Sequence, residues 1–175
     1  MIPINTGYSS RLVEVEVIAE DLLSQIFGIK LELPIKLESI AKFLDLTILI
    51  GDFQDEQIDG VFERSTKRIV VSSSAPQVRK RFTVAHEIGH FVLHSEMDKE
   101  IFFRSKSRNI SMEMDNIERE ANAFAAIILM PRDLTISQWR VTRNLSVLAS
   151  RFGVSKEAMQ YRLKGLGITV PRWAI

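Results

Sequence analysis

Two histidines and a glutamate in one short stretch are residue types that could bind a metal ion and use it. The stretch RFTVAHEIGHFVLH, residues 81–94, contains His86, Glu87 and His90 as His-Glu-x-x-His. On a helix, residues four positions apart lie on one face about 6 Å apart, so two imidazoles can converge on an ion. Glu87 would point to one side, where it reaches water on the ion without binding the ion. The ion would lower the pKa of that water to about 7, and Glu87 would act as general base.

A third ligand is needed, because histidines on the exposed face of a helix are common. His94 continues the row of His86 and His90, but the three residues would span about 12 Å at a rise of about 1.5 Å per residue. An ion about 2.1 Å from each nitrogen cannot satisfy three successive turns of one helix. We therefore expect His94 to line the cleft or to contact a ligand, with a merely exposed histidine as the alternative.

Glu118 is the stronger candidate for the third ligand. In NIEREANAFAAIILMP, residues 116–131, it borders an apolar helix face, and Asn122 follows one turn later on the same side. Glu120 falls on the other side of that face, nearer to solvent. The spacing equally fits a capping box with Asp115 as N-cap and Glu118 as the third helical residue. The pattern alone leaves ligand and cap as alternatives.

Two amphipathic helices, over about 76–94 and about 112–130, would hold these residues. The apolar stripe of the first helix centres on Ile88, and His86 and His90 fall about 160° from it. The back of this helix should therefore pack, while its front presents the histidines. Several alanines in the second helix would allow the two helices to approach closely.

The rest of the chain predicts an α+β fold that is mainly helical, with a small, mostly antiparallel, three-stranded sheet. Two further helices and three strands are expected, over 11–28, 37–45, 46–53, 60–65 and 67–73. The last two strands form a hairpin beside the first. The segment 95–114 is polar with little periodicity and predicts a loop, with room for one short strand.

The composition restricts the class of protein. Hydrophobic residues make up 46% of the chain, which is ample for a buried core. The absence of cysteine excludes disulfides and thiolate metal sites and suits a reducing compartment. No segment matches a signal peptide, and the apolar runs are too short to span a bilayer. We expect a soluble, cytoplasmic protein with no membrane partner.

The C-terminal part of the chain is basic. From residue 132 onward, the chain contains eight lysines and arginines but only two acidic residues. LSVLASRFGVSKEAMQYRLKGLG is typical of a helix-turn-helix, with a first helix to Arg151 or Phe152, a turn at Gly153 and Ser155 as N-cap of a second helix. The basic residues could bind DNA phosphates, but the apolar residues of the motif are also what its packing requires. Docking of a protein substrate, or packing over the cleft, is the favoured role.

Three segments together resemble the ImmA/IrrE family of metallo-endopeptidases. They are RFTVAHEIGHFVLH, IEREANAFAAIILMP and LASRFGVSKEAMQYRLKGLGI, with further likeness in LPIKLESIAKFLDL and GVFERSTKRIVV. The resemblance covers most of residues 30–168. It implies a gluzincin-like site with one Zn²⁺ per chain, whose ligands are His86, His90 and Glu118. Glu87 would be the general base, and Asn122 would support a ligand.

The resemblance also implies a function. We expect a zinc-dependent endopeptidase that cleaves a regulatory protein, in particular a helix-turn-helix repressor encoded nearby in a mobile element or stress-response locus. A zincin-like core would occupy residues 1–131, and a basic helical subdomain residues 132–175. The candidates for stabilising the transition state, by residue type alone, are His94, Arg81, Tyr161 and Arg162.

The alternative is a non-catalytic regulator, or a toxin–antitoxin-type component, that binds DNA or protein through its basic C-terminal subdomain. Glu87 favours the enzyme, because a structural zinc site has no need of a base.

Overall fold

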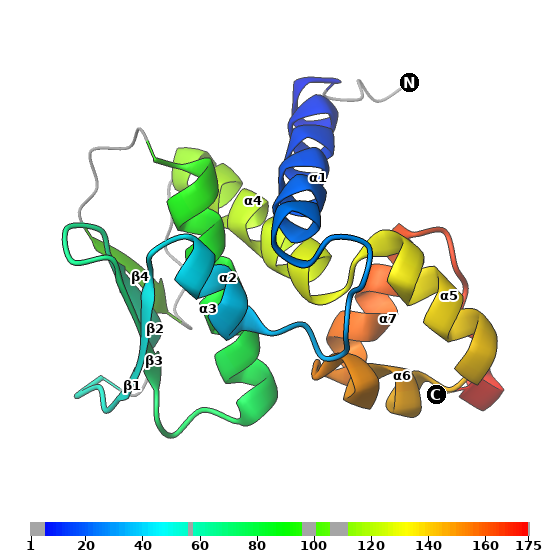
Figure 1. Ribbon diagram of the computed structural model, residues 1–175. Helices are drawn as coiled ribbons and strands as arrows, with labels where there is room; N and C mark the ends of the chain where they lie inside the picture. The colour runs from blue at the N-terminus through cyan, green and yellow to red at the C-terminus, as the bar shows by residue number, and fades with distance from the viewer. Residues whose placement is uncertain (1–5, 56–57, 96–100, 106–111, 175) are drawn as a thin grey trace.

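The structure is a computed structural model that describes residues 6–55, 58–95, 101–105 and 112–174. It has helices α1 (Thr6–Phe27), α2 (Leu37–Phe43), α3 (Gln77–Leu93), α4 (Met112–Leu129), α5 (Arg132–Thr142), α6 (Leu145–Phe152) and α7 (Lys156–Gly165), a short 3-10 helix η1 (Arg172–Ala174), and strands β1 (Thr47–Gly51), β2 (Ile58–Glu63), β3 (Arg68–Ser72) and β4 (Ile101–Ser105). Figure 1 shows the sheet at one side, α3 and α4 in the middle, and α5–α7 at the other side. The predicted α+β class is confirmed.

The sheet is mixed and has the strand order β1-β3-β2-β4. β2 and β3 form the predicted antiparallel hairpin, with a turn in which Lys67 has a φ of 51°. β1 pairs with β3 in parallel, because the chain crosses from β1 to the far side of β3 before the hairpin returns. β4 adds a fourth strand antiparallel to β2, where the sequence predicted a loop with room for one short strand. Two of the three pairings are antiparallel, as predicted, but the sheet has four strands rather than three.

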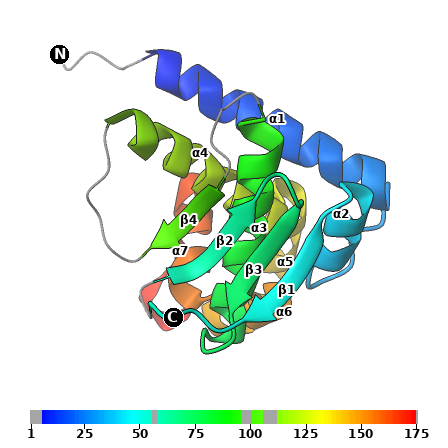
Figure 2. The ribbon, with the colours of Figure 1, turned by 90° about the vertical axis from the view of Figure 1, so that its left-hand side faces the viewer.

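Helix α3 packs against one face of the sheet, as Figure 2 shows. Its apolar residues Val84, Ala85 and Ile88 are buried. The approach to β2 is close at Gly60, where an added Cβ would lie 2.3 Å from Thr83 Cγ2. A glycine at this position lets the strand lie directly against the helix that carries the histidines.

Helix α4 packs on α3 on the side away from the sheet, and α1 packs on α4. The contact with α3 is close at Gly89, where an added Cβ would lie 3.2 Å from Ala121 Cα and 3.2 Å from Phe124 Cδ1. Small residues therefore bring the two helices together, as the alanines of α4 predicted. This contact brings Glu118 to the histidines of α3.

The C-terminal helices contain the predicted helix-turn-helix. Gly153 ends α6 in the left-handed conformation with a φ of 65°, and Ser155 caps α7 by accepting a hydrogen bond from the Ala158 N–H at 3.1 Å. Leu148, Phe152 and Met159 are fully buried. The apolar residues of the motif thus form its packing. The division of the chain at residues 131 and 132 stays a prediction.

Within the described segments, no helix combines the length and the apolar character that a membrane span requires.

Candidate metal centre

Three side chains from two helices converge at the contact between α3 and α4. The Nε2 atoms of His86 and His90 lie 3.0 Å apart, and each lies 3.2 Å from an oxygen of the Glu118 carboxylate. Both histidines are 1% exposed, whereas the Glu118 side chain is 22% exposed. Among the residues that the structure describes, these three form the group whose ligand atoms could hold one metal ion.

The distances fit a shared ion. Ligands about 2.1 Å from a tetrahedrally coordinated zinc ion lie about 3.4 Å from one another. The separations of 3.0 and 3.2 Å in this cluster are close to that value. Two imidazoles and one carboxylate leave the fourth tetrahedral position for water or substrate, as in catalytic rather than structural zinc sites.

The partner of His86 orients its ring for an ion. His86 Nδ1 lies 3.1 Å from Asn122 Oδ1, an amide oxygen that can only accept a hydrogen bond. The proton of His86 therefore resides on Nδ1, and Nε2 presents its lone pair to His90 and Glu118. Asn122 is therefore placed where it could support His86 as a ligand, and the role that the resemblance implied for it stays a prediction.

A longer series of contacts, through His94, Glu120 and Arg11, orients the ring of His90. His94 Nε2 lies 3.2 Å from Glu120 Oε2, and Glu120 also accepts a hydrogen bond from Arg11 Nε at 3.1 Å. Since a carboxylate accepts, His94 donates from Nε2 and, when neutral, has its lone pair on Nδ1. That atom lies 3.2 Å from His90 Nδ1. His90 must then donate from Nδ1, which leaves its Nε2 lone pair for an ion.

The pKa shift of His94 agrees with this assignment. Burial and the neighbouring His90 lower the pKa of His94, and they outweigh the opposing effect of Glu120. His94 is therefore neutral near pH 7. A second pKa shift concerns the carboxylate and does not depend on the tautomers. Burial alone would raise the pKa of Glu118, but its contacts with His86 and His90 in the ion-free site hold that pKa well below its usual range, so Glu118 is anionic. The cluster therefore presents an anionic carboxylate and two nitrogen lone pairs, which is a donor set suited to a cation.

Glu87 is fully buried in α3 between the two histidines. Its Oε1 atom lies on the side of the helix that faces β2, 3.8 Å from the place where a Cβ on Gly60 would be. This is the only position between the two histidines that carries a carboxylate. It is therefore the residue available as a base beside the cluster.

One alternative and one expectation about α4 were wrong. The helix begins at Met112, so Asp115 lies inside it and cannot be the N-cap of a capping box with Glu118. Glu120 is not in solvent, because its side chain is 12% exposed and contacts both His94 and Arg11. Arg11 and Glu120 are 109 positions apart, and no local pattern in the sequence indicated their contact.

The other candidates lie outside the cluster. Arg81 donates a hydrogen bond to the Ile35 carbonyl oxygen at 2.9 Å and lies beside Gly153. Arg162 donates to the Met130 carbonyl oxygen at 3.0 Å. Tyr161 is 81% exposed and, with Arg162 and Asn122, lines a pocket next to the histidines.

Comparisons with known proteins agree with this geometry. The sequence model of the IrrE N-terminal-like domain, a peptidase family designated M78, matches residues 41–164. These residues include the metal cluster, its supporting residues on α3 and α4, and the helix-turn-helix. The chain therefore belongs to the IrrE-like M78 peptidase family.

Two curated relatives are described as radiation response metalloprotease IrrE. The protein from Deinococcus radiodurans is 34% identical over 60% of this chain and 33% of its own length. The protein from Deinococcus deserti is 32% identical over 61% of this chain and 39% of its own length. The chain thus spans between about a third and two fifths of the length of these relatives. A solved structure of a Mycobacterium tuberculosis transcriptional regulator shares the fold, with a TM-score of 0.63 at 18% identity, over 86% of this chain and 47% of the other.

Proposed function

We propose that the protein is a zinc-dependent endopeptidase that cleaves a regulatory protein in the cytoplasm. The observation that carries this proposal is the convergence of His86, His90 and Glu118 beside the buried Glu87. Two histidines and one carboxylate suit several divalent ions, and zinc is the ion for which a donor set with one open position is most typical in peptidases. The two Deinococcus relatives, described as metalloproteases, support the same class of activity.

A zinc ion in the cluster would supply Lewis acidity and an acidified water molecule. His86 and His90, each with its proton fixed on Nδ1, would hold it through their Nε2 atoms, and Glu118 would complete the protein donors. Glu87 would accept a proton from the attacking water while the water oxygen bonds to the peptide carbonyl carbon. The same carboxyl group would then protonate the leaving nitrogen as the C–N bond breaks.

The substrate we propose is a helix-turn-helix repressor. The support for this is the resemblance of the chain to a family that acts on such proteins. The Mycobacterium tuberculosis protein that shares the fold is described as a transcriptional regulator, which is compatible with a role in gene regulation. A protein substrate also suits a metal centre that has an open pocket between several helices beside it.

The test of this function is a comparison of wild type with Glu87→Gln in cells that produce either protein at the same level. New protein N-termini would be identified by mass spectrometry after labelling of terminal amines. We expect new N-termini in a DNA-binding regulator with the wild type and none with Glu87→Gln, although the variant keeps its metal. Equal sets of N-termini in the two samples would contradict the proposal.

One observation favours a second function, a regulator that binds DNA. The helix-turn-helix is well formed, and Arg151, Lys156 and Lys164 are exposed on it. Arg162, however, turns inward to Met130 and Glu16 and so is not available to phosphates. Binding to duplex DNA that weakens steeply with salt, together with a biological effect that survives Glu87→Gln, would favour this alternative.

A further inference from the structure

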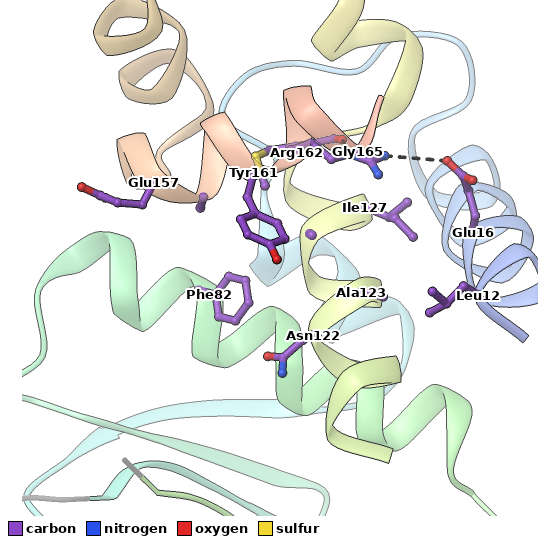
Figure 3. A pocket seen from close by; sticks show the side chains of 13 residues that line it. Leu12, Glu16, Phe82, Asn122, Ala123, Ile127, Glu157, Tyr161, Arg162 and Gly165 are labelled. Atoms are coloured by element: carbon purple, nitrogen blue, oxygen red, sulfur yellow. Dashed lines mark hydrogen bonds and ion pairs between the residues drawn. The ribbon is translucent and has the colours of Figure 1, made fainter. Parts of the chain in front are cut away.

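A pocket of about 640 Å³ lies between α1, α3, α4 and α7. Figure 3 shows α7 on one side of it, α4 behind it and α3 below. Most of its lining is apolar or aromatic and comes from Leu12, Phe82, Ala123, Ala126, Ile127 and Tyr161. The volume lies within the range of ligand-binding pockets and is sufficient for the largest side chains.

Two residues that line the pocket also contact His86, a member of the metal cluster. Asn122 lines it and accepts the hydrogen bond from His86 Nδ1 at 3.1 Å. Phe82 also lines it, and its ring centroid lies 6.5 Å from that of His86. Phe82 precedes His86 by one helical turn and Asn122 follows Glu118 by one turn, which corresponds to about 5.4 Å along each axis. An extended peptide covers that distance in about two residues, at about 3.3 Å per residue.

The chemistry of the lining favours an uncharged side chain. Arg162 lies at the pocket wall, but its Nε donates to the Met130 carbonyl oxygen at 3.0 Å and its guanidinium pairs with Glu16 at 3.8 Å. Glu157 is exposed at the edge. The α4 wall of the pocket includes two alanines, which carry no polar side-chain atoms. The ring of Tyr161, which is 81% exposed, lies beside Phe82. An exposed aromatic ring beside an apolar pocket is typical of a binding surface.

We propose that this pocket binds a large apolar side chain of the protein substrate, within two residues of the scissile bond. This inference rests on the proposed endopeptidase function. The pocket would bury a substrate side chain of the size of leucine or phenylalanine. This contact would position the nearby scissile peptide bond at the metal centre. The preference for one substrate side chain over another would then depend on two residues that line the pocket, Tyr161 of the helix-turn-helix and Ala126 of α4.

The test uses binding rather than cleavage. Zinc-loaded protein would be titrated with two series of short peptide hydroxamates, whose hydroxamate group chelates zinc, with the variable residue placed on either side of that group. Within each series only one side chain changes, from glycine to leucine to phenylalanine. In one series we expect leucine or phenylalanine to bind about tenfold to a hundredfold more tightly than glycine, because the side chain leaves water.

Variants that fill the pocket give the specific control. In Ala126→Trp and, from the opposite wall, Ala158→Trp, the affinity ratio of leucine to glycine should fall close to one. Val141→Trp, at an exposed position of α5 outside the lining, should keep the wild-type ratio. Metal content and thermal unfolding of each variant would show whether it folds.

The outcomes separate the two proposals. Hydroxamates that do not bind zinc-loaded protein would overturn the metallopeptidase function and the pocket inference with it. Hydroxamates that bind with affinities independent of the side chain would overturn the pocket inference alone. So would a leucine preference that persists in both folded tryptophan variants.

Discussion

The Nδ1 atoms of His90 and His94 lie 3.2 Å apart, and His94 is held at its other nitrogen by Glu120 and, through it, by Arg11. His94 continues the histidine row of α3 without joining the cluster that could hold an ion. Its contact with His90 fixes which nitrogen of His90 faces that cluster. His94, which resembles a third ligand in the sequence, thus contacts a candidate ligand in the structure instead of joining the cluster.

This relationship predicts that His94→Phe weakens metal binding roughly 10- to 100-fold, the usual effect of removing the partner of a metal-binding histidine. Phenylalanine keeps an aromatic ring of similar size but cannot accept the hydrogen bond from His90 Nδ1. The measurement is a competition titration of zinc between the protein and a chelating dye near neutral pH.

A matched control for that experiment is Glu14→Ala. Glu14 also pairs with Arg11, at 2.9 Å, but its side chain is 59% exposed and it contacts Arg11 Nη1, whereas Glu120 contacts Arg11 Nε. The affinity of this variant for zinc should stay at the wild-type value. If His94→Phe and Glu14→Ala both bound zinc like the wild type, His94 would have no part in orienting His90.

The close contact of β2 with α3 predicts that Gly60→Ala destabilises the protein by about 1–3 kcal/mol, the usual cost of overpacking a core. The new methyl group would lie 2.3 Å from Thr83 Cγ2, and Thr83 is buried. Thr83→Ser removes that methyl carbon, so the double variant should recover part of the loss. Urea unfolding of the wild type, the two single variants and the double variant would measure this, and an equal loss with and without Thr83→Ser would refute the steric explanation.

Metal removal should lower the thermal stability. A ligand that binds only the folded state at a hundredfold excess over its Kd stabilises it by about 2.7 kcal/mol, or about 5–10 °C for a chain of this length. Chelator treatment should therefore lower the Tm of the wild type, and added zinc should restore it. His86→Ala should show no response to either treatment. A wild-type Tm indifferent to zinc would count against a site in the folded protein.

The lowered pKa of Glu118 predicts a pH dependence in the metal-free protein. Because the folded-state pKa lies below the unfolded-state value of about 4.3, ionised Glu118 stabilises the fold above that value, and this contribution declines as the pH falls toward the folded-state pKa. The difference in unfolding free energy between wild type and Glu118→Gln should therefore be larger at about pH 5 than at about pH 3. A difference that stays constant or grows on acidification would contradict the assignment.

The sequence was sufficient to predict the cluster, because its geometry depends mostly on helical spacing. His86 and His90 share a face by their separation of four residues, and the small residues of α4 indicated the close contact that brings Glu118 to them. The helix-turn-helix followed in the same way from a glycine and a serine at its turn.

Other features depend on contacts that no local pattern encodes. The burial of Glu120 requires Arg11 from the first helix, and the wheel of α4 by itself placed Glu120 toward solvent. The parallel pairing of β1 with β3 depends on the path of the chain between strands. β4 has little periodicity of its own and is defined by its pairing with β2.

The most direct test of the metal site is the metal content of the purified protein, measured by elemental mass spectrometry for wild type and Glu118→Ala after both have been supplied with zinc. The structure predicts about one zinc ion per chain in the wild type and little or none in the variant, because the variant lacks the carboxylate that lies 3.2 Å from both histidines. Wild-type protein that holds no metal, or a variant that holds as much as the wild type, would contradict the assignment of His86, His90 and Glu118 as a metal site.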